Sequence, residues 1–91
     1  MKPFSLTLST PSGNVFQGQV VMLSVRGIAG ELAVMAGHIP FCTAIKAGVC
    51  KIAFPDDTDR KIVTDGGLLS VTEQGATLLS GEIFFEDDEG E

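Results

Sequence analysis

The sequence predicts an all-β protein, a two-layer β-sandwich of about nine or ten short, mainly antiparallel strands. Eleven Gly and four Pro divide the 91 residues so finely that the longest stretch without either, residues 56–65, leaves no room for helices of ordinary length. Between these breaks apolar residues alternate with polar ones, a period of two that is typical of strands with one buried face. The two observations together favour strands throughout.

The N-terminal half supplies the first strands. Residues 4–8 alternate Phe and Leu with Ser and Thr, which predicts a half-buried strand. Residues 11–14, PSGN, have the composition of a turn. A second strand is expected over 19–25, followed by a loop over 26–30 and a third strand over 31–35.

Further strands follow at short intervals, joined by connections that contain Gly, Pro or Asp. They are expected over 41–45, 49–54, 61–64, 68–71, 76–79 and 82–85. One sheet of so many short strands would leave an apolar face in water, so two sheets packed about 10 Å apart are the economical arrangement. A partly closed barrel has the same periodicity and stays an alternative. We expect one domain over residues 1–85 and an acidic tail over 86–91.

The acidic tail dominates the net charge of −6. Residues 86–91 hold five of the twelve acids, which leaves seven acids against six bases in the body. A nearly neutral body lacks the basic face that a nucleic-acid binder needs, so no nucleic-acid partner is expected. No apolar stretch reaches the roughly 18 residues of a membrane span, and the N-terminus has the features of neither a secretory signal nor a transit peptide.

The residues that could carry chemistry are few. Cys42 and Cys50 match neither a CxxC redox pair nor a paired zinc-ligand spacing, so both are expected to be buried or half-buried free thiols. His38 is the only histidine and has no Ser-His-Asp or metal-ligand grouping around it. No catalytic site, metal or cofactor is therefore predicted. From the residues alone, His38 is expected to bond a backbone carbonyl of its own turn, a role that is compatible with contact to a partner.

Gly66 and Gly67 follow Asp65 in a pattern that superficially resembles a phosphate-binding loop. No helix begins after them and no Lys is placed to meet a phosphate. A tight turn or bulge with positive φ is the better interpretation.

Three motifs carry a resemblance to a known family. They are TPSGNVFQGQV at 10–20, VRGIAGELAVMAGHIPFCTAIKAGV at 25–49, and DGGLLSV at 65–71 followed by ATLL. Their order resembles the N-terminal β-sandwich of the epsilon subunit of F-type ATP synthases, called delta in mitochondria. Ala36 and Ala47 stand where that family usually has Pro, and Ala33 where Gly is common. The helical hairpin that ends the family's usual chain has no counterpart in this sequence.

The resemblance implies a non-catalytic subunit of the central stalk, the rotor of a proton-translocating ATP synthase. Such a subunit binds the gamma subunit and contacts the ring of c subunits, coupling ion flow to ATP synthesis. Its place is peripheral, at the cytoplasmic face of a bacterial inner membrane or the equivalent face of another energy-transducing membrane, and it associates with the membrane only through the complex. Nucleotide binding in some family members uses the helical hairpin, so this chain is expected not to bind ATP by itself.

The resemblance also implies two sets of contact residues. The positions expected to face gamma are Thr10, His38, Ile39, Phe41 and Thr43, with Ala44 adding apolar surface. The positions expected to face the c ring are Arg26, Gly27, Ile28, Ala29, Gly30 and Glu31.

Two other functional classes stay open as alternatives. One is a free-standing β-sandwich module that binds a peptide or glycan, although the chain has no Trp or Tyr to form a sugar-binding platform. The other is a small hydrolase that uses His38 with Cys42.

Overall fold

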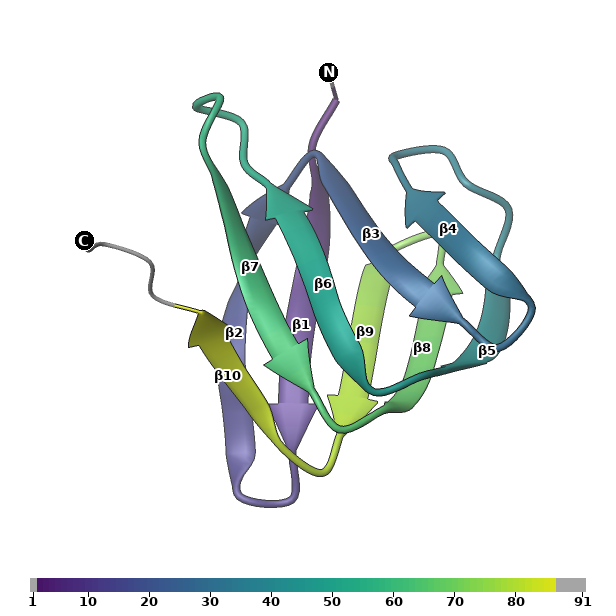
Figure 1. Cartoon of the computed structure of the whole chain (residues 1–91). Coiled ribbons are helices and arrows are strands. Elements are labelled where there is room, and N and C mark those ends of the chain that lie inside the picture. Colours follow the sequence, from purple (N-terminus) through teal and green to yellow (C-terminus); the bar gives the residue numbers. More distant parts are fainter. Residues whose placement is uncertain (1, 87–91) are drawn as a thin grey trace.

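The computed structural model describes residues 2–86, which form ten strands and no helix (Figure 1). In chain order they are β1 (Phe4–Thr10), β2 (Gly13–Val20), β3 (Met22–Gly27), β4 (Gly30–Val34), β5 (Phe41–Ile45), β6 (Gly48–Ala53), β7 (Asp59–Thr64), β8 (Gly67–Thr72), β9 (Gly75–Ser80) and β10 (Ile83–Glu86). The all-β prediction is confirmed. None of the described residues belongs to a helix that could cross a membrane.

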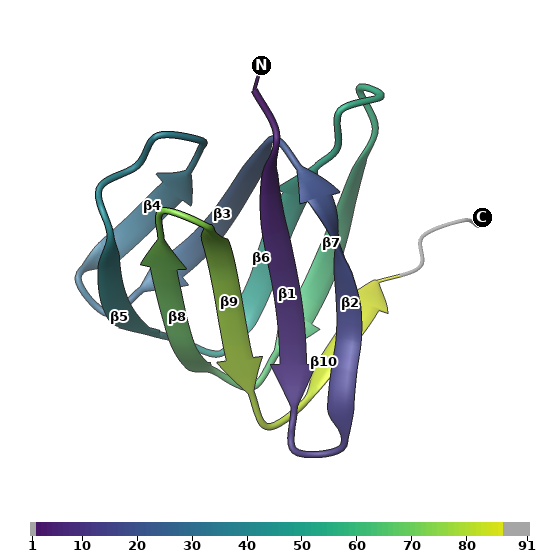
Figure 2. The same ribbon diagram turned by 180° about the vertical axis from the view of Figure 1, so that it is seen from behind.

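The strands form two layers. The first layer contains β10, β7, β6, β3 and β4, and it faces the viewer in Figure 1. The second layer contains β5, β8, β9, β1 and β2, and it faces the viewer in Figure 2. All neighbouring strands are antiparallel except β1 and β9, which run parallel. The layers join where β3 meets β5 through the single pair Gly27 and Ile45, so the sandwich is also one sheet curled nearly into a barrel.

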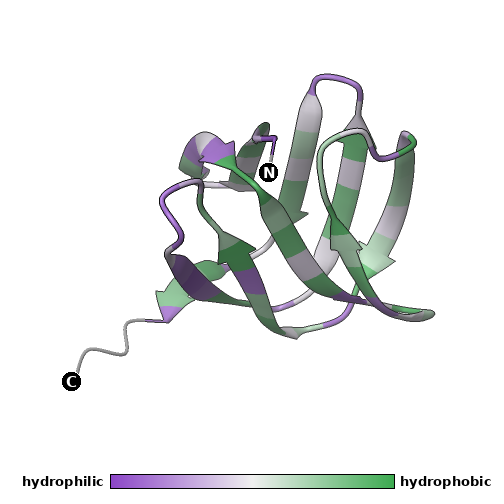
Figure 3. Ribbon diagram, turned by 90° about the horizontal axis from the view of Figure 1, so that it is seen from above, coloured by the Kyte–Doolittle hydropathy of each residue, from purple (hydrophilic) through white to green (hydrophobic). Residues whose placement is uncertain are grey.

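The core between the layers is aliphatic, and alternate residues of each strand supply it. Figure 3 shows the resulting bands of hydrophobic and hydrophilic residues along the strands. The largest fully buried side chains are Leu6, Leu8, Leu23, Ile52, Ile62, Leu69, Leu78, Val20 and Val34. Close packing of such side chains makes a stiff body, because interiors at this density compress little.

Aromatic side chains lie at the margin of this core. The Phe16 ring from β2 meets those of Phe54 and Phe85 edge-on, with centroids 5.9 and 6.2 Å away. The Arg60 guanidinium lies 4.1 Å from the Phe85 ring centroid. Since Phe16 belongs to β2 and Phe85 to β10, the cluster links the two strands that end the sheet path.

The strand expected over 19–25 is wrong, because the chain turns a corner inside it. Val20 ends β2 and Val21 lies between the strands, although both are buried, with 0% and 8% exposure. Two consecutive inward side chains break the alternation where the chain passes from one layer to the other. The Val21 amide donates to the Ala53 carbonyl over 2.8 Å, which anchors the corner to the first layer.

Of two connections between strands, the loop expected over 26–30 differs from the expectation, whereas the turn at Gly66 and Gly67 agrees with it. The loop expected over 26–30 is shorter, because β3 continues to Gly27 and β4 begins at Gly30. The turn with positive φ expected at Gly66 and Gly67 is confirmed, with φ values of 96° and 155°. A Cβ on Gly67 would collide with the carbonyl oxygen of Leu79, so the two strands approach more closely there than any side chain allows.

Candidate functional site

The outer face of the second layer carries no charged side chain among the described residues. Its outward positions are recognised by alternation with the buried positions of each strand and by cross-strand register. They include Cys42, Ala44, Leu68, Ser70, Thr72, Thr77, Leu79, Ser5, Thr7, Ser9, Gln17 and Gln19. We call this surface the charge-free face.

The outer face of the first layer is built differently. By the same alternation its outward positions include Arg26, Glu31, Lys51, Asp59, Lys61 and Glu86. Charged residues are depleted in the cores of protein interfaces because their desolvation is costly. The contrast between the two faces therefore marks the charge-free face as a candidate protein interface.

Two leucines stand near one end of the charge-free face. Leu68 of β8 and Leu79 of β9 are direct register partners and are 42% and 46% exposed. Their other register partners are small, Ala44 on β5 and Ser9 on β1. The two leucines consequently stand above their neighbours as the largest apolar surface of the central strands.

A hollow of about 420 Å³ lies beside the two leucines. Its lining residues come from the ends of β1, β8 and β9 and from the adjoining turns: Ser9, Thr10, Pro11, Gly67, Leu68, Leu79, Ser80 and Gly81. We call it the leucine hollow. It gives this end of the charge-free face a concave surface beside the two leucines.

Thr10 is the member of the expected gamma-facing set that borders the leucine hollow. Its hydroxyl donates to the Gly13 carbonyl and accepts from the Ser12 amide, each over 3.2 Å. These bonds hold the β1–β2 turn, so the threonine methyl group is the part that remains for a partner.

Phe41 and Thr43 lie on the inner side of β5. Their register partners on β8 are the buried Val71 and Leu69, and directly paired residues project to the same side of a sheet. Both are half-buried, and the Thr43 hydroxyl donates to the Ala44 carbonyl over 3.3 Å. The structure thus places them behind the charge-free face.

His38 and Ile39 lie in the connection between β4 and β5. His38 Nδ1 lies 2.9 Å from the carbonyl oxygen of Ile39, and because a carbonyl only accepts, Nδ1 is the donor. The His38 ring also packs against Phe41, with centroids 4.9 Å apart. The bond to a carbonyl of its own turn is confirmed. Ile39 is 76% exposed and free to meet a partner.

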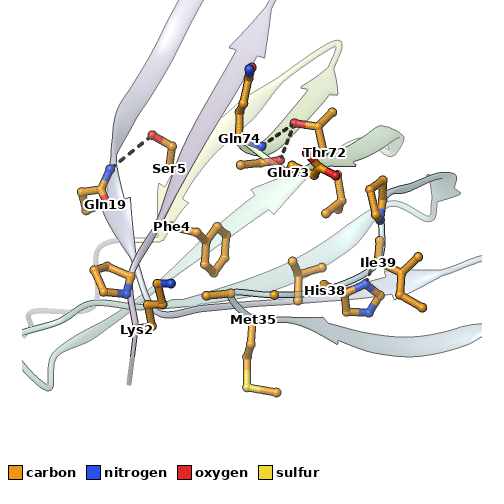
Figure 4. A pocket seen from close by; sticks show the side chains of 17 residues that line it. Lys2, Phe4, Ser5, Gln19, Met35, His38, Ile39, Thr72, Glu73 and Gln74 are labelled. Carbon is orange, nitrogen blue, oxygen red and sulfur yellow. Dashed lines mark hydrogen bonds between the residues drawn. The ribbon is translucent and has the colours of Figure 1, made fainter.

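This connection borders a second cavity, of about 620 Å³, which we call the mouth cavity (Figure 4). Residues 2–5 and the β8–β9 turn complete its lining, which mixes apolar side chains such as Met35 with polar ones such as Gln19 and Glu73. His38 already uses Nδ1 in its own turn, and Cys42 projects from the outer face of β5. The pair expected for a hydrolase is therefore not assembled.

The residues expected to face the c ring form the end of the β3–β4 hairpin. Arg26 and Glu31 are register partners on its strands, with Nη2 of the arginine 3.9 Å from Oε2 of the glutamate. Only Ile28 and Ala29 lie outside the strands, and Ile28 is 62% exposed. The Lys46 amide donates to the Arg26 carbonyl over 2.8 Å, which holds the hairpin against the end of β5.

The cysteines differ from the expectation in one respect. Cys50 is buried, and this burial raises the pKa of its thiol. Cys42 is exposed on the charge-free face, because the alternation of β5 turns it outward. The described residues contain no cluster of three or more His, Cys, Asp or Glu side chains suited to a metal ion.

Sequence reasoning missed the centre of the charge-free face. Leu68, Ser70, Thr77 and Leu79 were placed on strands without a functional role, and Cys42 was expected to be less exposed. The signal was nevertheless present, since the outward positions of these alternating strands are all uncharged. It becomes visible only when the strands are known to lie side by side.

Comparisons with known proteins agree with this architecture. The family model described as ATP synthase, Delta/Epsilon chain, beta-sandwich domain matches residues 3–86. The ATP synthase epsilon chain of Bacillus pumilus is 34% identical over 80 residues, which cover 88% of this chain and 60% of that relative. The chain thus spans less than two thirds of that relative's length.

Two solved structures share the fold. A chain of the Euglena gracilis mitochondrial ATP synthase, solved with OSCP, F1 and the c ring, matches with a TM-score of 0.88 at 20% identity, over 96% of this chain and 56% of that one. A chain of the central stalk and c ring of Tetrahymena thermophila mitochondrial ATP synthase matches with a TM-score of 0.78 at 15% identity, over 99% and 75%. With the family model matching nearly all of the described residues, the chain belongs to the delta/epsilon chain family of ATP synthases and spans its β-sandwich domain.

Proposed function

We propose that this domain is a non-catalytic component of the rotor of a proton-translocating F-type ATP synthase. It binds the gamma subunit through the charge-free face and contacts the c ring through the end of the β3–β4 hairpin. The observation that carries the proposal is the absence of charge across the outward side of five strands, set against the charged outer face of the other layer.

The composition of the charge-free face suits a permanent protein contact. Hydroxyl groups and small side chains lose little on desolvation when they find hydrogen-bond partners, whereas each buried charge requires a matched partner. A standard interface covers about 800 Å² on each partner, which the outer face of a five-stranded layer can supply. Two of the expected gamma-facing residues lie at the margins of this surface, Thr10 at the end of β1 and Ile39 before the start of β5.

A rotor subunit also has to transmit torque without deforming. The two layers share an aliphatic core, and every strand is hydrogen-bonded to at least one neighbour. Close packing gives such a body low compressibility, so a force applied at the hairpin is transmitted to the charge-free face with little deformation of the domain.

The hairpin offers a second contact surface away from the mouth cavity. Its exposed Ile28 is flanked by Arg26 and Glu31, whose exposed ion pair contributes at most about 1 kcal/mol and therefore separates easily to meet polar groups of a partner. Contact with the c ring in this way makes the membrane association peripheral and dependent on the complex. The corresponding membrane face is the cytoplasmic one in bacteria.

Cys42 provides a direct test of the gamma contact. It is exposed on the charge-free face while Cys50 is buried, so a maleimide reagent should label Cys42 alone in the folded domain. Gamma in stoichiometric excess should protect Cys42 and co-elute with the domain in size-exclusion chromatography. Full labelling of Cys42 within a stable complex would show that gamma binds elsewhere.

A matched pair of charge insertions tests which layer is used. Thr77→Lys adds charge to the charge-free face, and Val63→Lys adds the same charge to the outer face of β7. We expect Thr77→Lys to weaken gamma binding at least tenfold and Val63→Lys to leave it within twofold. The opposite order would assign gamma to the first layer.

The c-ring contact is tested by cross-linking in the assembled enzyme. In a Cys42→Ser background, a photoreactive label attached through Glu31→Cys should capture the c subunit. The same label attached through Asp57→Cys, in the β6–β7 connection, is the control and should not capture the c subunit. Capture from Asp57 and not from Glu31 would refute the proposed orientation.

A further inference from the structure

Two of the residues that line the leucine hollow, Gly67 and Gly81, carry no side chain. A Cβ on Gly67 would collide with the Leu79 carbonyl oxygen, and a Cβ on Gly81 would lie 2.8 Å from Oδ2 of Asp65. The atoms packed behind these two glycines therefore exclude a side chain at either position. The hollow itself is present in the domain without a partner.

The polar groups of the hollow are largely committed to the fold. The Thr10 hydroxyl donates to Gly13 and accepts from Ser12 within its own turn. The Ser80 hydroxyl is turned inward, 2.6 Å from the Gly66 carbonyl oxygen and 2.7 Å from Oδ1 of Asp65. A polar group that entered beside them would find few free partners, so the hollow favours an apolar occupant.

The leucines themselves favour the same occupant. Leu68 and Leu79 remain 42% and 46% exposed although they face each other across neighbouring strands. Contact with a second apolar group removes this surface from water without desolvating any charge. Binding energy in interfaces concentrates at such points, where a side chain fills a pocket surrounded by near-neutral contacts.

We propose that the leucine hollow is a socket for one apolar side chain of the gamma subunit, and that Leu68 and Leu79 are the main anchors of this interface. The proposal rests on the proposed function, since it names the point within the charge-free face where gamma is held. The occupant is a side chain of the size of Leu, Met or Phe, presented by an uncharged part of gamma. Continuity with Thr10, which lines the socket and belongs to the expected gamma-facing set, supports this partner.

The test compares truncations on the two outer faces. Leu79→Ala removes one wall of the socket, Leu79→Met keeps it apolar, and Val63→Ala is a similar truncation on the other layer, where Val63 is 37% exposed. Binding of purified gamma is measured by titration with each variant, and melting temperatures confirm that all of them fold. We expect Leu79→Ala to weaken binding at least tenfold, with Leu79→Met and Val63→Ala within threefold of the unmodified domain.

Protection of Cys42 separates failure of the socket from failure of the proposed function. If gamma protects Cys42 and Leu79→Ala binds as tightly as the unmodified domain, gamma uses the face but not the socket, and this inference is wrong. If gamma neither binds nor protects Cys42 in the unmodified domain, the proposed function itself fails. If the domain alone forms a dimer that Leu79→Ala dissolves in sedimentation, the occupant is a second copy and the assignment to gamma is overturned.

Discussion

The hydroxyl of Ser80 lies 2.7 Å from Oδ1 of Asp65, which joins the β7–β8 connection to the end of β9. The same carboxylate oxygen accepts a hydrogen bond from the Glu82 amide over 3.1 Å. Ser80 is 6% exposed. These contacts hold together the connections that border the leucine hollow.

The Asp65 carboxylate predicts a pH dependence of stability. The hydrogen bond from Ser80, and after it that from the Glu82 amide, lowers the pKa of Asp65 below its ordinary value. A lowered folded-state pKa contributes stability that is fully present above the unfolded-state value of about 3.9 and is lost as the pH falls through the folded-state value. Urea unfolding between pH 2 and 7 should show a smaller acid loss for Asp65→Asn than for the unmodified domain.

Glu73→Gln is the control for this measurement, because it removes the same charge from the β8–β9 turn. Its unfolding free energy should follow that of the unmodified domain across the pH range. An Asp65→Asn profile parallel to that of Glu73→Gln would mean that Asp65 contributes nothing to the acid dependence.

Substitution by alanine should have very different costs at the adjacent positions Leu78 and Leu79. Leu78 is fully buried, whereas Leu79 is 46% exposed on the charge-free face. Leu78→Ala should cost about 2–5 kcal/mol of unfolding free energy, because it removes buried methyl groups and leaves a cavity. Leu79→Ala should cost about 0.5 kcal/mol or less. Chemical denaturation measures both, and equal losses would contradict the orientation of β9.

Alanine substitutions at Gly67 and Gly48 distinguish the cost of a steric collision from the cost of backbone strain. Their φ values are similar, 155° and 147°, but a Cβ at Gly48 meets no atom within 4 Å while one at Gly67 meets the Leu79 carbonyl oxygen. Gly48→Ala should therefore cost about 1–3 kcal/mol from its backbone conformation alone. Gly67→Ala should cost clearly more, seen as a lower midpoint in thermal unfolding. Equal costs would show that β8 and β9 do not approach so closely.

The two cysteines should react at different stages of unfolding. Cys42 is exposed, whereas burial of Cys50 raises the pKa of its thiol and lowers the fraction of reactive thiolate. A thiol reagent near pH 8 should modify Cys42 rapidly in the native domain and Cys50 only in denaturant. Mass spectrometry of the labelled peptides identifies each site, and rapid native labelling of Cys50 would be inconsistent with its place in the core.

Strand positions were predictable for most of the strands that keep one face in the core, although most of β2 was not expected. β5 matches the expected range 41–45, and β8 and β9 differ from theirs by a residue at each end. The expectation failed at Val20 and Val21, where the chain changes layers and both side chains turn inward. Alternation reports which side of a strand is buried, and it loses meaning at a residue where the buried side changes.

The sequence by itself determined the all-β class, most of the strand segments but not β2, the turn at Gly66 and Gly67 and, through its motifs, the family. Only the tertiary structure decided that Cys42, Leu68, Leu79 and Ser9 lie on one uncharged surface and that Thr43 lies behind it. The reason is that side-chain alternation is a local property of a few consecutive residues, whereas the order of strands in a sheet is not. The parallel pairing of β1 with β9 joins residues from opposite ends of the chain, and the leucine hollow exists only because those ends meet.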